Sequence, residues 1–482
     1  METLPDDVWL LVLEKLMRST VDRDIFNCRL VCKRLAVLVL HPSLWRGRTL
    51  RGVSSPPVCA CPVLRLVPCL EKMLLHLPEE GCRQWSYAST RCAAAKLAIN
   101  VNKGTSYAAA VICRQEMLGR LKRVVVYFDP DADDGALSEV SVLLGTLAST
   151  SRLERLCVVV YAAKKPMPTT PAPFLASTTV ASSLRKFRCT LSPLFEPFVR
   201  FILSEHAATL EKVDLGESDS SLAFSSTAPL LAGVTNLSKL TCSCLPGLEV
   251  LATCKTLRVL ELNVHTRSLN RQTVAGVAKL LRRAEHLREV KLEYWPAVRS
   301  VADVGADLVS ALAASGRSRV ETLLIYNYIL RPDGVENAPL LQVVARALPS
   351  LSALRRLSLE ENATNLDDLL LAITPDVAPS LQRVELKLMG KDCAHSWLHC
   401  DTVKTVMSVN PSLHLLLHDY VVKRYCTDNE ERCQACKLEC HEEIMARSRY
   451  WHPLCLFSHD PMAACLENHT KRSYEDWIHL PP

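Results

Sequence analysis

A short pattern of apolar residues recurs through the middle of this chain. Each instance begins with leucine, or once with valine, and carries apolar residues three and five positions later, as in Leu257-Arg-Val-Leu-Glu-Leu262. Ten instances begin between residues 121 and 381, at a mean spacing of about 29 residues. Apolar residues at alternate positions of a short segment are typical of a strand that buries one face. The pattern therefore predicts one strand-containing unit, repeated many times.

The segments between these strands have the periodicity of amphipathic helices. In residues 272–284, the apolar side chains of Val274, Val277, Leu280 and Leu281 recur at spacings of three and four. A strand and a helix within each period of this length resemble the leucine-rich repeat. The resemblance implies an α/β repeat fold, a curved solenoid with strands on its concave side and helices outside.

A doubly wound α/β domain is the alternative, because it also alternates strands and helices. Such a domain would carry a glycine-rich phosphate loop, but the chain has only 15 glycines in 482 residues and neither G-x-G-x-x-G nor a P-loop. The regular spacing favours the repeat.

The first 48 residues have a different organisation. Pro5 suits the first turn of a helix, and the acidic Asp6 and Asp7 suit the positive end of that helix. A second helix is expected from Asp22 to Leu40, ending before Pro42. So short a unit cannot bury a large core, and it carries more apolar surface than its helices need among themselves. We expect a partner to cover the remainder.

The order and spacing of these residues resemble the F-box. The match includes Leu4-Pro5, Leu16, Leu30-Val31-Cys32-Lys33, and Pro42, Leu44 and Trp45. Leu35 departs from it, because many F-boxes carry tryptophan there, and residues 17–24 are longer and more polar than usual. The alternative is a helical hairpin packed on its own domain. The resemblance implies docking on an Skp adaptor through Leu4, Pro5, Val8, Leu16, Leu30, Val31, Pro42, Leu44 and Trp45.

Four segments are predicted. They are the three-helix F-box at 1–48, a linker with atypical capping repeats at 49–120, the leucine-rich-repeat solenoid at 121–420, and a Cys/His-rich C-terminal cap at 421–482. Within the second segment we expect a short helix near residues 70–77 and a strand at 96–101. A proline-rich stretch at 164–178 is expected to form a loop.

The C-terminal cap contains a possible zinc site. Cys433 and Cys436 are three residues apart, and His452 and Cys455 follow with the same spacing. Three cysteines and one histidine make a complete tetrahedral shell, so a bound zinc would be structural. Residues 450–456 resemble the centre of a LIM-type finger. Replacement ligands nearby are Cys426, Cys440, His441, His459 and Cys465, and free thiols are the alternative to a metal.

Composition and charge limit the function. A net charge of +6 is mild for this length, no apolar run reaches the roughly 20 residues of a membrane span, and no signal peptide is visible. The 21 cysteines, an odd number, indicate reduced thiols in the cytoplasm or nucleus. The absence of recognisable catalytic motifs predicts that the chain is not an enzyme.

An F-box followed by leucine-rich repeats is similar to the substrate receptors of Skp–cullin–F-box ubiquitin ligases. The resemblance implies an adaptor, cullin and RING subunits as partners, and an unidentified target protein held for proteasomal degradation. Two alternatives are a scaffold that binds the adaptor without a ligase and a zinc-dependent binder of nucleic acid or chromatin.

The concave face is the expected target surface. Its mixed charges suit a protein better than a nucleic acid, which favours a uniformly basic strip. A merely solvated face and target binding by the proline-rich loop are the alternatives. The candidate residues are Glu261, Glu289, Lys291, Glu293, Arg356, Glu360, Arg383, Glu385 and Lys387.

Overall fold

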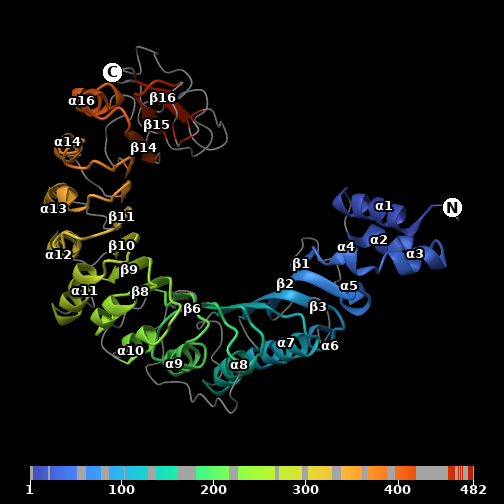
Figure 1. The fold of residues 1–482 in the computed structure, drawn as a ribbon. Coiled ribbons are helices and arrows are strands. Elements are labelled where there is room, and N and C mark those ends of the chain that lie inside the picture. Colours follow the sequence, from blue (N-terminus) through green and yellow to red (C-terminus); the bar gives the residue numbers. More distant parts are fainter. Residues whose placement is uncertain are drawn as a thin grey trace, which may run out of the picture. The chain divides into compact units, whose positions relative to one another are not determined.

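Figure 1 shows the fold in a computed structural model of the chain. The structure describes residues 4–480, apart from the segments 20–21, 52–60, 78–85, 102–103, 129–136, 161–180, 217–225, 266–270, 296–301, 328–337, 361–365, 388–396, 419–453, 462–464 and 470–475 and the single residues 466 and 468. The predicted proline-rich loop therefore lies outside the described residues.

The chain divides into two compact units. The first contains residues 1–215 and 233–236, and the second contains residues 216–232 and 237–482. Each unit is described by itself below.

Four helices open the first unit, where three were expected. They are α1 (Asp6–Ser19), α2 (Asp22–Cys28), α3 (Lys33–Leu38) and α4 (Pro42–Trp45). The prediction of one helix from Asp22 to Leu40 is wrong, because the chain leaves α2 after Cys28 and starts α3 at Lys33. The extended backbone of Cys32 begins α3, and its Sγ accepts a hydrogen bond from the Leu35 amide.

Strands and helices alternate through the rest of the first unit. The elements are β1 (Thr49–Arg51), α5 (Cys61–Leu66), β2 (Cys69–Leu77), α6 (Ser86–Ser89), β3 (Ala93–Val101), α7 (Thr105–Met117), β4 (Arg123–Phe128), α8 (Leu137–Ser149), β5 (Arg155–Val160), β6 (Lys186–Cys189), α9 (Glu196–Glu205) and β7 (Lys212–Asp214). Strands β1 to β7 pair in parallel and in sequence order. This is the arrangement that one repeated strand–helix unit produces.

The helix expected near residues 70–77 is in fact strand β2. Met73, Leu75 and Leu77 are buried, while Leu74 and His76 between them are more exposed, so the burial has a period of two. The run of apolar residues hid this alternation in the sequence. The strand expected at 96–101 lies within β3.

The second unit continues the same alternation. Its elements are α10 (Thr227–Ala232), β8 (Lys239–Ser243), η1 (Leu248–Thr253), β9 (Val259–His265), α11 (Arg271–Arg283), β10 (Glu289–Trp295), α12 (Ala302–Ala313), β11 (Thr322–Asn327), α13 (Ala338–Ala347), η2 (Leu348–Ser350), β12 (Arg356–Glu360), α14 (Asp367–Leu371), β13 (Arg383–Lys387), α16 (Asp401–Val409), β14 (His414–His418), β15 (Leu454–Phe457) and β16 (Asp476–His479). Strands β8 to β14 are parallel. Strand β15 pairs antiparallel with β14, and β16 pairs parallel with β15.

The core of each unit lies between its strands and its helices. In the instance at 257–262, Leu257, Leu260 and Leu262 are buried, while Val259 and Glu261 between them are partly exposed. In each unit the helices cover one face of the strands (Figure 1). We call the opposite face the strand face. The predicted fold, N-terminal helices followed by leucine-rich-repeat units, is confirmed. Among the described helices, none is long and apolar enough to cross a membrane.

Candidate functional site

The N-terminal helices expose an unusual amount of apolar surface. Of the 14 large apolar side chains that are exposed among the described residues, eight lie between Leu4 and Val37. They are Leu4, Val8, Leu11, Val12, Leu16, Leu30, Val31 and Val37. A soluble domain rarely gathers so many in so short a segment unless a partner covers them.

Helix α1 carries apolar residues on two faces. Leu13 and Met17 are buried inside the unit. On another side of the helix, Val8, Leu11, Val12, Lys15 and Leu16 line an open groove. Their spacing of three and four places them along one stripe of the helix. One face of α1 therefore holds the unit together, and the other is available to a second protein.

Polar contacts hold the segments that present this surface. The Arg34 side chain on α3 donates to the backbone oxygen of Leu4, with 2.6 Å between the atoms, and pairs with the Asp6 carboxylate at 2.6 Å. The start of α1 is thereby tied to α3. Trp45 stacks on Phe26 with 5.4 Å between ring centroids and donates a hydrogen bond from Nε1 to the oxygen of Val39. These contacts fix the exposed side chains on a packed framework.

The expected adaptor anchors fall into two groups. Leu4, Pro5, Val8, Leu16, Leu30 and Val31 are exposed, the last two at 86% and 60%. Leu44 and Trp45 are buried and pack the helices together, and Pro42 is partly exposed. Three exposed residues were missing from the expected set: Leu11, Val12 and Val37. The second apolar face of α1 is the sequence signal that could have identified Leu11 and Val12.

The strand face of the first unit carries a row of basic residues that the sequence analysis missed. The strand register aligns one Lys or Arg from each of six consecutive strands, β2 to β7. We call these residues the basic row: Lys72, Lys96, Arg123, Arg155, Lys186 and Lys212. Each precedes a buried core residue, so the pleat directs its side chain to the strand face. The backbones of neighbouring strands are about 4.8 Å apart.

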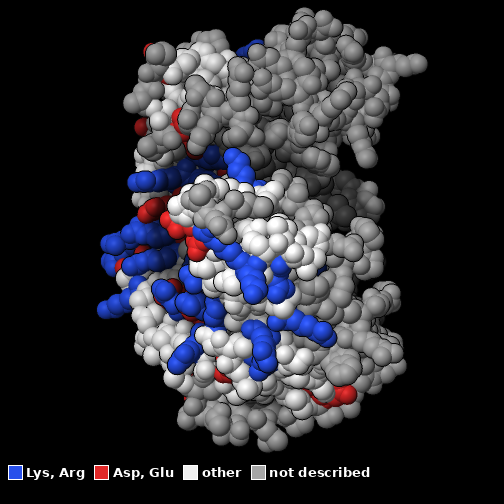
Figure 2. All heavy atoms as spheres, turned by 90° about the vertical axis from the view of Figure 1, so that its right-hand side faces the viewer, with Lys and Arg blue, Asp and Glu red and all other residues white. Residues whose placement is uncertain are grey.

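Most members of the basic row form no ion pair with the acids that the structure describes. Among the described residues, Lys96 is the only member with an ion pair, to Glu71 at 2.6 Å. Glu154 pairs instead with Lys122, and Asp214 with Arg188. The hydrogen bond from Lys96 lowers the pKa of Glu71, so that carboxylate stays charged and engaged. Figure 2 shows Lys and Arg side chains gathered on one face of the molecule, with Asp and Glu among them.

A second row lies beside the basic row on the same strand face. The register aligns Leu74, Ala98, Val125 and Cys157 on β2 to β5, which are all apolar, and continues with Arg188 and Asp214 on β6 and β7. Leu74 and Val125 are partly exposed, whereas Ala98 and Cys157 are buried. The strand face of the first unit thus combines positive charge with apolar surface.

The strand face of the second unit holds the residues expected to bind the target, and many of them pair with one another. Glu261 pairs with Lys239 at 2.5 Å and accepts a hydrogen bond from Thr241. Burial raises the pKa of Glu261, but these two hydrogen bonds outweigh it and the net pKa is lowered. Lys291 pairs with Glu293 and lies 4.7 Å from the centre of the Tyr326 ring. Glu289 and Glu360 lie on β10 and β12, and Lys387 ends β13.

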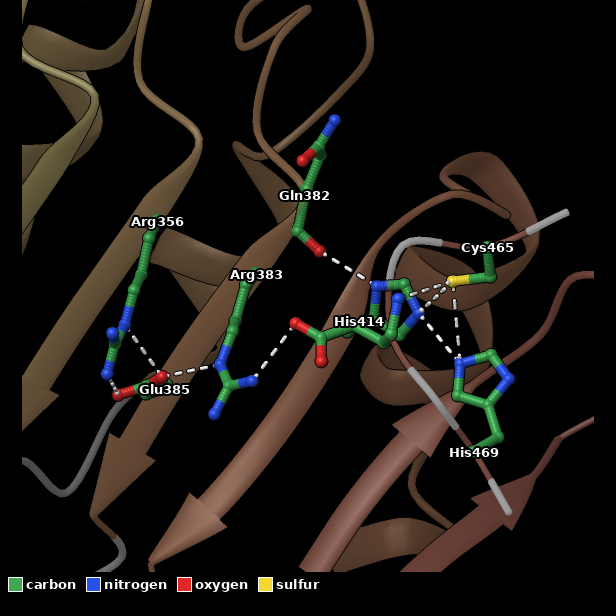
Figure 3. A network of polar contacts seen from close by, with 8 residues as sticks. Arg356, Gln382, Arg383, Glu385, His414, Cys465 and His469 are labelled. Atoms are coloured by element: carbon green, nitrogen blue, oxygen red, sulfur yellow. Dashed lines mark hydrogen bonds and ion pairs between the residues drawn. The ribbon is translucent and has the colours of Figure 1, made fainter. Parts of the chain in front are cut away.

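Glu385 is the centre of a buried charge network (Figure 3). Only 2% of its side chain is exposed, and its Oε1 lies 2.8 Å from Arg356 Nε and 2.6 Å from Arg383 Nε. Arg383 also pairs with Glu467 at 3.1 Å. Burial lowers the pKa of Arg383, but the two carboxylates outweigh it and the net pKa is raised. The arginines offset the cost of burying a carboxylate. These four residues are already engaged with one another.

The expected zinc ligands lie mostly outside the described residues, namely Cys433, Cys436 and His452. Cys455 is described: it is buried in β15 and pairs in register with Leu416 and Trp477. A different group of Cys and His side chains comes together beside β14.

Comparisons with known proteins agree with this organisation. Residues 1–51 match the F-box-like family. The chain therefore carries an F-box-like domain followed by leucine-rich-repeat units. No curated protein sequence matches the chain.

Two solved structures are similar to this chain, each at 12% sequence identity. The leucine-rich repeat-containing protein LegL7 from Legionella pneumophila has a TM-score of 0.37, with 72% of this chain and 91% of LegL7 covered. The crystal structure of the Rad7 and Elc1 complex in yeast has a TM-score of 0.34, with 85% of this chain and 86% of that chain covered.

Proposed function

We propose that this protein is a substrate receptor of an Skp–cullin–F-box ubiquitin ligase. The exposed apolar surface of the F-box-like domain supports the proposal most directly. Covering one such side chain stabilises a complex by about 1.5–3 kcal/mol. Several neighbouring side chains supply enough for a stable complex with an adaptor. The chain brings a target close to a conjugating enzyme and contributes position rather than chemistry.

We further propose that the target is a protein segment rich in acidic and apolar residues. The basic row would bind its carboxylates or phosphates, and the apolar row beside it would contact its apolar side chains. A nucleic acid, which favours a uniformly basic strip, is the alternative occupant, but the acids and apolar residues beside the basic row favour a protein segment. Binders of single strands interleave basic residues with several aromatic platforms, whereas the residues of the apolar row are all aliphatic or sulfur-containing.

The adaptor-binding surface is tested by changing side chains that do not contribute to the core. Leu30→Asp with Val31→Asp places two charges in a surface that the adaptor would cover. We expect the Kd for a purified Skp adaptor, measured by titration calorimetry, to rise about 100-fold or more, because two apolar side chains are no longer buried in the complex. The control is Met117→Asp, since Met117 is 77% exposed on α7, outside this surface.

Binding that survives in the double variant would contradict the adaptor site. The ligase role is tested separately by adding purified cullin and RING subunits to the adaptor complex. A receptor recruits them and supports ubiquitin transfer, whereas a scaffold binds the adaptor and leaves the cullin free.

A further inference from the structure

Three histidines and one cysteine converge at the C-terminal end of the second unit. His414 begins β14, His459 follows β15, and Cys465 and His469 precede β16. One ligand atom from each of these four residues lies within 4.8 Å of the others. His414 is buried and the other three are partly exposed. We call these residues the C-terminal cluster; Figure 3 shows three of them.

The distances within the cluster fit a tetrahedral metal ion. Bond lengths of about 2.0–2.1 Å to nitrogen and 2.3 Å to sulfur place tetrahedral ligands about 3.3 Å apart for two nitrogens and about 3.6 Å apart for nitrogen and sulfur. The Nε2 atoms of His414 and His469 are 3.1 Å apart. Cys465 Sγ lies 3.4 Å from the former and 3.6 Å from the latter.

Backbone carbonyls orient two of the imidazoles toward the centre of the cluster. His414 Nδ1 lies 3.1 Å from the oxygen of Gln382, and His459 Nδ1 lies 3.1 Å from the oxygen of Pro411. A proton on each Nδ1 satisfies these carbonyls and leaves each Nε2 with a lone pair directed inward. Metal-binding histidines are held in this way by their outer hydrogen bonds.

The hydrogen bonds among the cluster residues do not include one buried imidazole nitrogen. His459 Nε2 is buried and has no hydrogen-bond partner within the described part of the chain. An unsatisfied buried nitrogen is costly, and a metal ion would satisfy it. Burial lowers the pKa of His414 and of His469, which favours the neutral imidazoles that metals bind.

Aromatic side chains enclose the cluster. Phe457 stacks on His469 with ring centroids 4.0 Å apart, and Trp477 meets the His414 ring edge-on at 5.4 Å. Such a shell limits the access of water to a bound ion.

We propose that His414, His459, Cys465 and His469 bind one zinc ion. Four protein ligands fill a tetrahedral shell, so the site is structural. It joins β14, the last strand of the continuous parallel series, to the segment between β15 and β16 and thereby closes the C-terminal end of the repeats. It also holds Glu467, whose amide contacts Cys465 Sγ and whose carboxylate pairs with Arg383. This ligand set differs from the sequence-based set of Cys433, Cys436, His452 and Cys455, although His459 and Cys465 were among its possible replacements.

The test is the metal content of the purified full-length chain after dialysis against a weak chelator. Elemental analysis should find zinc, and His459→Gln with His469→Gln should lower the content by one ion per chain. Cys254→Ser with His286→Gln, which changes the same residue types elsewhere in the second unit, should leave it unchanged. Cys433→Ser with Cys436→Ser should still contain the ion bound by the cluster.

A variant that keeps four ligands separates loss of metal from loss of folding. Cys465→His should retain one ion. Loaded with Co²⁺, it should keep the visible bands of a tetrahedral site and lose the near-ultraviolet thiolate-to-cobalt band of the wild type. Three outcomes would each overturn the proposal. The wild-type protein could contain no metal, the His459 and His469 variant could keep its metal content unchanged, or changing only Cys433 and Cys436 could remove all metal.

Discussion

The two units place different chemistry at the same position of the same repeat. In the first unit this position holds Lys72, Lys96, Arg123, Arg155, Lys186 and Lys212 in neighbouring strands. In the second unit the aligned residues are Lys239, Val259, Glu289, Thr322, Arg356, Arg383 and His414. A repeated backbone aligns equivalent side chains in a row, so one position per repeat decides whether a face is uniformly basic or mixed.

The charges on the first unit are suited to binding a partner, whereas those on the second unit stabilise the fold. Like charges on neighbouring strands repel one another, so the basic row does not stabilise the folded chain and is better explained by an anionic partner. In the second unit, Glu385 satisfies two arginines, and the network costs little because its charges cancel. We therefore expect substitutions in the first unit to change binding and substitutions in the second unit to change stability.

The largest expected effect is on binding to the basic row. Arg123→Glu with Arg155→Glu should raise the Kd for a labelled acidic peptide about 100-fold, since a hydrogen bond to a charged group contributes about 1.5–3 kcal/mol. Wild-type binding should weaken as salt rises, because exposed charges are screened. Fluorescence anisotropy measures both.

The control variant reverses the same number of charges elsewhere. Arg317 and Lys404 are 79% and 61% exposed in the second unit and are not members of the basic row, so changing both to Glu should alter the Kd little. An equal loss in this control would show that net charge alone attracts the peptide. Tighter binding of a single-stranded oligonucleotide than of the peptide would favour the nucleic-acid alternative.

A smaller effect is expected on the stability of the second unit. Glu385→Gln removes the negative charge between Arg356 and Arg383, both of which can still reach water, so we expect the free energy of unfolding to fall by about 2 kcal/mol. Arg155→Gln in the basic row should change it by less than about 0.5 kcal/mol. Urea unfolding followed by circular dichroism compares the variants. A larger loss for Arg155→Gln would contradict the division between the units.

The sequence predicted the repeats well because their signal is local. Alternating leucines place a strand, and helical spacing places the helix that follows. Prediction failed where a local pattern was ambiguous, as in β2, and at Cys32, where a side-chain cap divides the expected helix. The basic row was overlooked although the third position of the first four motif instances is Arg, Arg, Lys and Lys. The repeat is defined by its apolar positions, and only the strand register shows that these charges form one row.

Sites built from distant residues were less accessible to prediction. The C-terminal cluster joins His414 to His469 across 55 positions, and no short motif contains that pair. Likewise, the sequence indicated mixed charges on the strand face of the second unit but not which of them pair. The burial of Glu385 depends on Arg383 of the same strand and Arg356 of the neighbouring strand, and it follows only from their packing.

The smallest expected effect is a difference in pH dependence between the two faces. The pKa of Glu261 is lowered in the folded chain, so its contribution to stability is present above the ordinary Glu pKa of about 4.3 and is lost as pH falls through the lowered value. Glu261→Gln should therefore reduce the fall in unfolding free energy between pH 6 and pH 3. Glu154→Gln in the first unit should reduce it less. The pKa of Glu154 is also lowered by Lys122, but this pair is exposed and screened by solvent. Equal changes in the two variants, measured by urea unfolding at each pH, would mean that the exposed carboxylate of Glu154 and the more buried carboxylate of Glu261 contribute alike.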